Sequence, residues 1–152
     1  MKRFRMTLHF QPFHRDHFPE YKLWYEDPYL NRELGPMDDE WLRAVLNEAS
    51  VQQYSVFHES ELIAVLGIVR ANEQYSYIVI TDVAIKPSMR KRGLGKAVLR
   101  QLLQLESKER PARWRAYVNK RNVPALRCFE SLGWRRSSDA DTELWCFEWE
   151  LS

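Results

Sequence analysis

The sequence predicts a mixed α/β fold in which helices flank a central, largely antiparallel sheet. Two apolar runs of strand length, at residues 62–69 and 75–85, are typical of strands that are covered on both faces. Apolar residues recur three and four positions apart within residues 93–107 and 122–132, which indicates amphipathic helices. Strands follow one another before the first of these helices, and strand and helix alternate after it. We therefore expect an antiparallel first half and a later strand–helix–strand crossover.

The N-terminal third is expected to hold one strand and two helices. The strand is predicted at residues 6–10, and roughly helical spacing of aromatic residues predicts a helix over residues 14–24. Asp38 is suited to cap a second helix that reaches residue 49, because side-chain oxygens accept hydrogen bonds from the first helical turn. Between the two helices, the Asp-Pro and Gly-Pro pairs within residues 27–36 indicate an irregular connection.

The remaining chain is expected to form three strands joined by short turns and then the two helices already named, each followed by a strand. The predicted strands share apolar alternation or continuous apolar character, and Gly133 is placed to end the second helix. These strands are expected at residues 54–57, 62–69, 75–85, 114–118 and 144–151, with a further short strand as an option after Trp134.

Composition limits the class of protein before any motif is considered. A chain of 152 residues fits one domain and can bury roughly 70% of its unfolded surface. With 23 basic and 21 acidic side chains the net charge is only +2, which does not by itself indicate a nucleic-acid or membrane-surface protein. No run reaches the length of a membrane span and residues 7–11 supply no signal-peptide core, so a cytoplasmic protein is expected. Cys128 and Cys146 lie in apolar patterns and are expected to be free thiols.

The segment that indicates chemistry runs from a strand end at residue 85 into a helix that begins near residue 93. Two glycines let the backbone approach a ligand, and the first helical turn presents unpaired N–H groups at the positive end of the helix dipole. Four cations lie within seven residues, at Arg90, Lys91, Arg92 and Lys96. We expect this segment to bind a pyrophosphate.

Other interpretations of this basic segment compete with that expectation. A dinucleotide fingerprint would need glycine in place of Val98, and a phosphate-binding loop would need serine or threonine in place of Ala97. A solvated basic turn and a nucleic-acid contact both remain open. Nucleic-acid binding is disfavoured, because no regular interleaving of aromatic and basic residues surrounds the segment.

Two blocks of the sequence resemble the GCN5-related N-acetyltransferase family. The first is Val83-Ala84-Ile85-x-Pro87-x-x-Arg90-x-x-Gly93-x-Gly95, which resembles the acetyl-CoA signature of that family. The second extends from Tyr117-Val118 through Asn122 and Ala125 to Phe129-Glu130-x-Leu132-Gly133-Trp134 and resembles the later strand–helix segment. The resemblance implies one acyl-CoA N-acyltransferase domain over residues 1–152, with the acceptor side in residues 1–52 and the sheet and acetyl-CoA core in residues 53–152.

The resemblance also implies which residues contact acetyl-CoA. Backbone N–H groups of the basic segment would hold the pyrophosphate, main-chain groups of the preceding strand would pair with the pantetheine arm, and the arm would enter between residues 81–85 and 114–118. Asn122 would contact the cofactor, although a helix N-cap explains it equally well. The implied cofactor-binding residues are Val83, Ala84, Ile85, Arg90, Lys91, Arg92, Gly93, Leu94, Gly95, Lys96, Asn122 and Phe129.

The reaction that the family performs is the attack of an amine on the acetyl thioester. An alkylamine with a pKa of about 10.4 is mostly protonated at neutral pH, so a base or a water chain should remove its proton. Asp82 is the candidate base because it is an acidic residue within an apolar strand, although alternation places it on the face of Ile80 and Ala84. A structural aspartate is the competing interpretation, and Glu33, Glu40 and His58 stay open as bases.

A backbone N–H near Val83 or Ala84 is expected to stabilise the thioester oxygen as it becomes anionic. The family's general acid, a tyrosine, is replaced by Phe129 in this sequence. A thiol with a pKa of about 8.5 leaves readily as a thiolate, so water, Tyr117 or no general acid would suffice. The missing tyrosine also favours the alternative that the chain is a catalytically idle acyl-CoA-binding or regulatory module.

The acceptor is expected to be a primary amine, first of a small molecule and otherwise of a protein N-terminus or lysine. The residues predicted to bind it are Trp24, Tyr25 and Glu33, because aromatic faces and carboxylates suit a cation. Helical packing on the sheet explains Trp24 equally well. We expect no metal, nucleic acid or membrane as a partner, and a monomer or homodimer.

Overall fold

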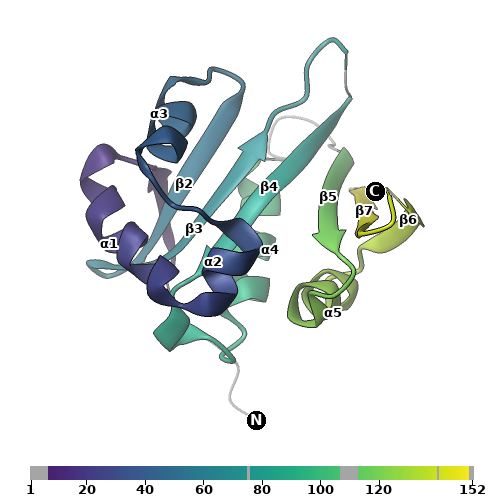
Figure 1. The fold of residues 1–152 in the computed structure, drawn as a ribbon. Helices are drawn as coiled ribbons and strands as arrows, with labels where there is room; N and C mark the ends of the chain where they lie inside the picture. Colours follow the sequence, from purple (N-terminus) through teal and green to yellow (C-terminus); the bar gives the residue numbers. More distant parts are fainter. Residues whose placement is uncertain (1–6, 75, 107–112, 140, 151–152) are drawn as a thin grey trace. The chain divides into compact units, whose positions relative to one another are not determined.

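The computed structural model describes residues 7–74, 76–106, 113–139 and 141–150. Within them the chain forms a mixed α/β fold with an open, mostly antiparallel sheet of seven strands in the order β1-β2-β3-β4-β5-β7-β6 (Figure 1). The strands are β1 (His9–Pro12), β2 (Val51–His58), β3 (Glu61–Val69), β4 (Tyr77–Ile85), β5 (Arg113–Asn119), β6 (Arg135–Asp139) and β7 (Leu144–Glu150). The helices are η1 (Arg15–His17), α1 (Phe18–Leu23), η2 (Trp24–Glu26), α2 (Pro28–Leu34), α3 (Asp39–Asn47), η3 (Pro87–Met89), α4 (Leu94–Glu106) and α5 (Val123–Ser131), of which the η elements are single 3-10 turns.

The predicted fold class is confirmed, and most of the predicted elements are present within a few residues. β4 and β5 pair in parallel, from Tyr77 opposite Arg113 to Ile80 opposite Ala116, and α4 connects them in sequence. This is the expected strand–helix–strand crossover. The optional strand after Trp134 is β6, which pairs antiparallel with β7.

The chain divides into two compact units. The first unit comprises residues 1–68 and 82–94, and the second comprises residues 69–81 and 95–152. β4 contributes its last four residues to the first unit and the preceding residues to the second.

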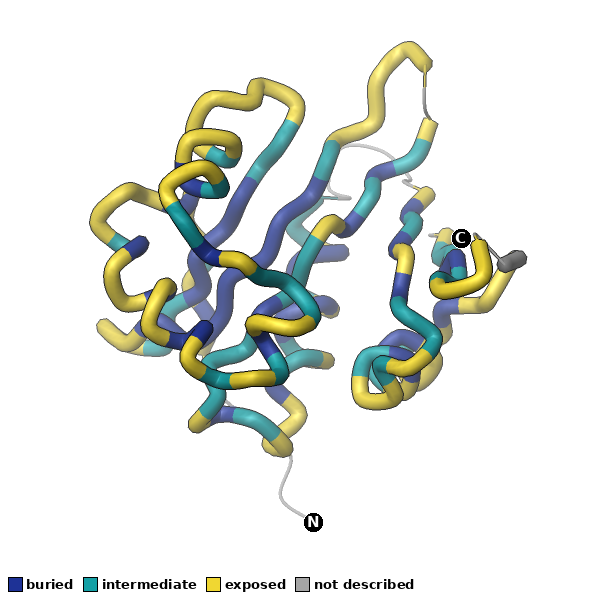
Figure 2. The backbone as a smooth tube through the Cα atoms, in the orientation of Figure 1, coloured by how far each residue is buried: buried dark blue, intermediate teal, exposed yellow. Residues whose placement is uncertain are grey.

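The first unit packs α1, α2 and α3 onto one face of its strands. Figure 2 shows that the middles of β2 and β3 are continuously buried, as expected for strands covered on both faces. Aromatic rings fill the space under the helices: the ring of Trp41 lies 5.4 Å from those of Phe13 and Tyr21, centroid to centroid. The buried residues of this cluster are Phe13, Phe18, Tyr21, Trp24, Tyr25, Leu30, Met37, Leu42, Leu62, Val65 and Ala84.

Two predictions for this unit are wrong in detail. The connection predicted to be irregular contains α2, because Asp27 caps the helix and Pro28 occupies its first position: the Leu30 N–H donates to the Asp27 carboxylate at 3.1 Å. The first strand begins at His9 rather than at residue 6, which lies outside the described residues. The cap at Asp38 is confirmed, since the Trp41 N–H donates to its carboxylate at 3.0 Å.

The second unit surrounds the antiparallel ladder of β5, β7 and β6. Trp114 and Phe147 are fully buried, and the ring of Phe129 lies 4.9 Å from that of Trp134 and 5.8 Å from that of Phe147. Gly133 ends α5 with a left-handed φ of 89°, while the Trp134 N–H donates to the Phe129 carbonyl at 3.1 Å. Cys128 and Cys146 are free thiols, as predicted.

Candidate functional site

The backbone between β4 and α4 contains two left-handed residues directly before the helix. β4 ends at Ile85, the Lys86 N–H donates to the Ile63 carbonyl at 2.9 Å, and the turn η3 follows. Lys91 and Gly93 then adopt left-handed conformations with φ of 63° and 77°. Left-handed residues within a turn can direct successive N–H groups to one side, and here they directly precede α4, whose first-turn N–H groups have no partner within the helix itself. The segment of residues 90–95 is called the basic loop below, and that its backbone N–H groups bind a diphosphate stays a prediction.

The four cations predicted around this loop are not equivalent. The side chains of Lys91, Arg92 and Lys96 are exposed. The guanidinium of Arg90 instead forms two hydrogen bonds to the carboxylate of Asp27, at 3.0 Å and 2.5 Å, and lies 4.9 Å from the centroid of the Tyr29 ring. Arg90 is thus committed to a partner within the protein.

The two glycines of the basic loop differ in what they require of the backbone. Gly93 supplies a left-handed φ without the steric cost that a Cβ would bring. A Cβ built on Gly95 would meet the Cys128 sulfur at 3.6 Å, which is ordinary van der Waals contact, so packing alone does not require glycine there. The residues present fit a ligand bound through backbone N–H groups.

The side chain of Asp82 lies among other polar side chains of the first unit. Its carboxylate accepts a hydrogen bond from the Gln53 side-chain amide at 2.8 Å. Alternation along β4 directs Asp82 to the same face as Ala84, which packs in the aromatic cluster with Tyr21 and Tyr25. The hydroxyls of those two tyrosines are 2.5 Å apart.

The ionisation of this group is determined mainly by burial. Burial raises the pKa of Tyr21, and the neighbouring Tyr25 hydroxyl and Asp82 carboxylate raise it further. Burial also raises the pKa of Tyr25, against a smaller lowering by its hydrogen bond to Tyr21. Both phenols therefore keep their protons at neutral pH.

The residues predicted to bind the acceptor lie in or beside the aromatic cluster. Trp24 and Tyr25 are buried, and the indole N–H of Trp24 has no hydrogen-bond partner among the residues that the structure describes. Glu33 is half-buried and lies 3.5 Å from Arg32. Of the alternative bases, Glu40 is exposed, and the His58 ring nitrogen Nδ1 lies 3.3 Å from the Thr7 carbonyl.

Three residues predicted to bind ligand or to act in catalysis lie in the second unit, namely Asn122, Phe129 and Tyr117. Asn122 caps α5, because its side-chain oxygen accepts from the Ala125 N–H at 3.3 Å. Phe129 is buried between Trp134 and Phe147, whereas Tyr117 is 42% exposed. Whether Asn122, Phe129 and Tyr117 also contact ligands stays a prediction.

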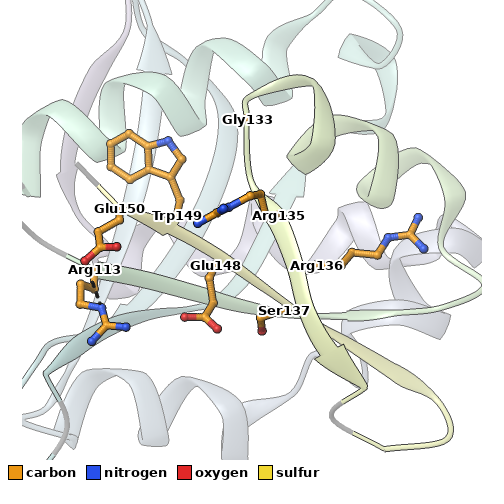
Figure 3. Close-up of a pocket in the computed structure, with 8 residues that line it drawn as sticks. All are labelled: Arg113, Gly133, Arg135, Arg136, Ser137, Glu148, Trp149 and Glu150. Atoms are coloured by element: carbon orange, nitrogen blue, oxygen red, sulfur yellow. Dashed lines mark ion pairs between the residues drawn. The ribbon is translucent and has the colours of Figure 1, made fainter. Parts of the chain in front are cut away.

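The second unit also contains a hollow of about 460 Å³ that holds none of the predicted site residues. Figure 3 shows its lining side chains over β5, β7 and β6, with a dashed line for the ion pair that joins Arg113 to Glu150 at 3.4 Å. Arg136, which also lines it, pairs with Glu130 at 2.9 Å. The lining residues are Arg113, Gly133, Arg135, Arg136, Ser137, Glu148, Trp149 and Glu150. Charges of both signs lie side by side here, so the hollow lacks the concentrated charge of the basic loop.

Metal sites and membrane-spanning helices are two further features to consider among the described residues. In the part of the chain that the structure describes, no three His, Cys, Asp or Glu side chains are grouped so that they could hold a metal ion. No described helix combines the length and apolar character needed to cross a bilayer.

The sequence of this chain matches a known protein family, in agreement with the fold. Residues 11–134 match the acetyltransferase (GNAT) family, so the chain belongs to that family and acetyl-CoA is its cosubstrate. No curated protein matches the chain in sequence.

Solved structures share the fold at low sequence identity. An acetyltransferase from Thermus thermophilus is 19% identical with a TM-score of 0.82, over 96% of this chain and 98% of that one. A spermidine N-acetyltransferase from Vibrio cholerae, in complex with CoA and spermine, is 10% identical with a TM-score of 0.79, over 94% and 95% of the two chains. The Campylobacter jejuni N-acetyltransferase PseH, in complex with acetyl coenzyme A, is 16% identical with a TM-score of 0.73, over 96% and 100%.

The sequence did not predict that Asp27 pairs with Arg90, that Gln53 donates to Asp82, or that the hydroxyl of Tyr21 bonds to that of Tyr25. Asp27 carried a signal, since an Asp-Pro pair fits the N-cap and first position of a helix. Gln53 carried no such signal, because it lies in β2 beside other polar residues, although its side chain is buried at 4% exposure. Nothing local in the sequence distinguishes Tyr21 from the other core aromatics.

Proposed function

We propose that the protein is an N-acetyltransferase that transfers the acetyl group of acetyl-CoA to a primary amine of a small molecule. The observation that carries the proposal is the basic loop, in which left-handed Lys91 and Gly93 lead into the start of α4. Family membership supports the class of reaction. A small-molecule amine is supported by the fold neighbours, which include a spermidine N-acetyltransferase and an aminoglycoside acetyltransferase.

In this proposal the basic loop holds the diphosphate of acetyl-CoA. Backbone N–H groups of residues 91–95 donate to it, and the exposed side chains of Lys91, Arg92 and Lys96 add positive charge. Main-chain groups of Val83 and Ile85 pair with the pantetheine arm. The bound cosubstrate supplies an acetyl group activated as a thioester.

Asp82 is proposed to take the proton from the acceptor ammonium. Tyr21 and Tyr25 stay protonated, so neither phenol serves as the base, and Asp82 supplies the carboxylate beside them. The hydrogen bond from Gln53 fixes one carboxylate oxygen. The neutral amine nitrogen then bonds to the acetyl carbon, the carbon–sulfur bond breaks with its electrons on sulfur, and the nitrogen loses its second proton to solvent.

A second candidate function is an acyl-CoA-binding module without catalysis. Two observations favour it: Phe129 occupies the position of the family's tyrosine acid, and the proposed base lies beneath a buried aromatic cluster. This candidate predicts cofactor binding with no turnover on any acceptor.

Turnover with a panel of amines separates the two functions. The wild-type protein is incubated with acetyl-CoA and polyamines, aminoglycosides, amino acids or peptides, and released CoA is measured. We expect release with at least one small amine, and a D82N variant should bind CoA normally but lose at least about tenfold in kcat, as expected for a missing general base. CoA binding without release on any acceptor would favour the module, and release with peptides alone would favour a protein acetyltransferase.

A further inference from the structure

The side chain of Arg90 does not extend toward solvent like those of its basic neighbours. Both terminal nitrogens of its guanidinium donate to the two carboxylate oxygens of Asp27, at 3.0 Å and 2.5 Å. The planar group also lies 4.9 Å from the centroid of the Tyr29 ring. A bidentate pair with an aromatic ring beside it fixes both the position and the orientation of a guanidinium.

Asp27 is itself held in place by a second role. Oδ2 of Asp27, which accepts from Nη2 of Arg90, also accepts the Leu30 N–H at 3.1 Å, and Asp27 so caps α2. Tyr29 belongs to the first turn of the same helix. The start of α2 is therefore attached to Arg90, the first residue of the basic loop, by two hydrogen bonds that Asp27 accepts and by the ring of Tyr29.

The residue that follows Arg90 needs such support. Lys91 adopts φ of 63°, a conformation that is unfavourable for a residue with a side chain and persists only where the surroundings impose it. Met89, which precedes Arg90, is buried. Buried Met89 and paired Arg90 together fix the chain immediately before the strained residue.

We propose that Asp27, Arg90 and Tyr29 form a latch that holds the basic loop in its diphosphate-binding conformation. Asp27 is thereby a positioning residue for acetyl-CoA, even though its negative charge opposes that of the ligand. The inference rests on the proposed binding of the diphosphate at this loop, but it does not require catalysis.

The latch and simple electrostatics predict opposite results for the loss of Asp27. If the charge of Asp27 acts only through its field, removing it makes the loop more positive and tightens the binding of an anion. If Asp27 holds the loop, removing its charge weakens binding, because the left-handed conformation of Lys91 is populated less of the time. The sign of the change decides between the two.

Glu61 provides a matched control. Its carboxylate pairs with Lys86 at 2.8 Å and is also influenced by the charge of Arg92, so it lies in the field of the same loop. Among the contacts of the described residues, Glu61 makes none with Arg90 and caps no helix. E61Q therefore removes the same charge as D27N and leaves the latch intact.

The test is the dissociation constant of CoA, measured by titration calorimetry for wild type, D27N, E61Q, R90K and the double variant D27N/R90K. Asparagine still caps α2, and lysine keeps the positive charge but cannot form a bidentate pair. We expect D27N and R90K each to weaken CoA binding by about tenfold, the double variant to be no weaker than either single variant, and E61Q to bind as tightly as wild type or more tightly. Circular dichroism of each variant without CoA checks that it is folded.

Tighter or unchanged CoA binding in D27N would overturn the latch, as would additive effects of D27N and R90K. If one variant does not fold, the other single variant still gives the sign. Failure of the latch is distinguishable from failure of the proposed function, because the former leaves wild-type CoA binding and turnover intact. Wild-type protein that binds no CoA would contradict both.

Discussion

Gly93 and Gly95 lie two residues apart in the basic loop but have different backbone requirements. Gly93 has φ of 77°, and a side chain in that conformation costs about 1–2 kcal/mol. Gly95 is the second residue of α4, where a Cβ would make an ordinary contact with Cys128. The two positions therefore allow the loop conformation to be tested separately from the helix.

We expect G93A to lower the free energy of unfolding by about 1–2 kcal/mol because of its left-handed backbone. G95A should leave it unchanged or raise it by up to about 1 kcal/mol, since alanine is the better helix former. Urea denaturation of the two variants measures both values. Equal destabilisation by the two substitutions would contradict the conformation assigned to Gly93.

The hydroxyls of Tyr21 and Tyr25 form a hydrogen bond inside the aromatic cluster of the first unit. Y21F removes one hydroxyl and leaves the other without this partner, so we expect a loss of about 1 kcal/mol in the free energy of unfolding. Y25F should cost a similar amount, and the double variant less than the sum, because the pair shares one bond. Chemical denaturation of the three variants measures this coupling, and fully additive losses would contradict it.

At the scale of elements, α2 depends on its first residues more than on helix propensity. A helix of seven residues is too short to be stable by itself, so its N-cap and its packing determine whether it forms. Asp27 supplies the cap and the pair with Arg90, while Leu30 is buried in the aromatic cluster. The stability of α2 should therefore respond to the charge of one carboxylate.

The pH dependence of stability follows from this carboxylate. The hydrogen bonds from Arg90 lower the pKa of Asp27, against a smaller effect of burial, and the Leu30 N–H lowers it further. A carboxylate with a lowered folded-state pKa stabilises the protein above its unfolded pKa, about 3.9, and loses that contribution as pH falls through the lowered value. We expect D27N to flatten the acid side of the curve of unfolding free energy against pH, measured by urea denaturation between about pH 2 and 6. A curve as steep as that of wild type would contradict the pairing.

Elements with a strong apolar period could be predicted from the sequence, whereas α2, which begins at an Asp-Pro pair, and contacts between distant residues could not. α4 and α5 lie within a residue or two of their predicted bounds because their apolar positions repeat along one face. The prediction for α2 is wrong because Asp27-Pro28 resembles a break, although the same pair begins a helix when the aspartate turns its side chain onto the backbone. Arg90 belongs to the signature, but its partner lies 63 residues away and no local pattern connects them.

At the scale of the whole molecule, charge is distributed unevenly although the total is small. The net charge is +2, yet Lys91, Arg92 and Lys96 are all exposed within six residues. A local basic cluster of this kind attracts any polyanion, whereas a cradle of backbone N–H groups selects a compact diphosphate. Competition between acetyl-CoA and a nucleic acid therefore tests which of the two properties dominates.

We expect acetyl-CoA to raise the melting temperature of the protein. Acetyl-CoA at about one hundred times its dissociation constant adds about 2.7 kcal/mol to the free energy of unfolding. For a domain of this size that corresponds to a rise of roughly 5–10 °C, measured by differential scanning fluorimetry. A G93D variant should lose the rise, because its side chain brings a negative charge and a strained backbone to the diphosphate position.

A single-stranded oligonucleotide at physiological salt should neither reproduce this rise in melting temperature nor displace acetyl-CoA, because non-specific binding through three exposed cations is weak under those conditions. An oligonucleotide that displaced the cofactor would mean that exposed charge, rather than the left-handed backbone at Lys91 and Gly93, determines what the loop binds.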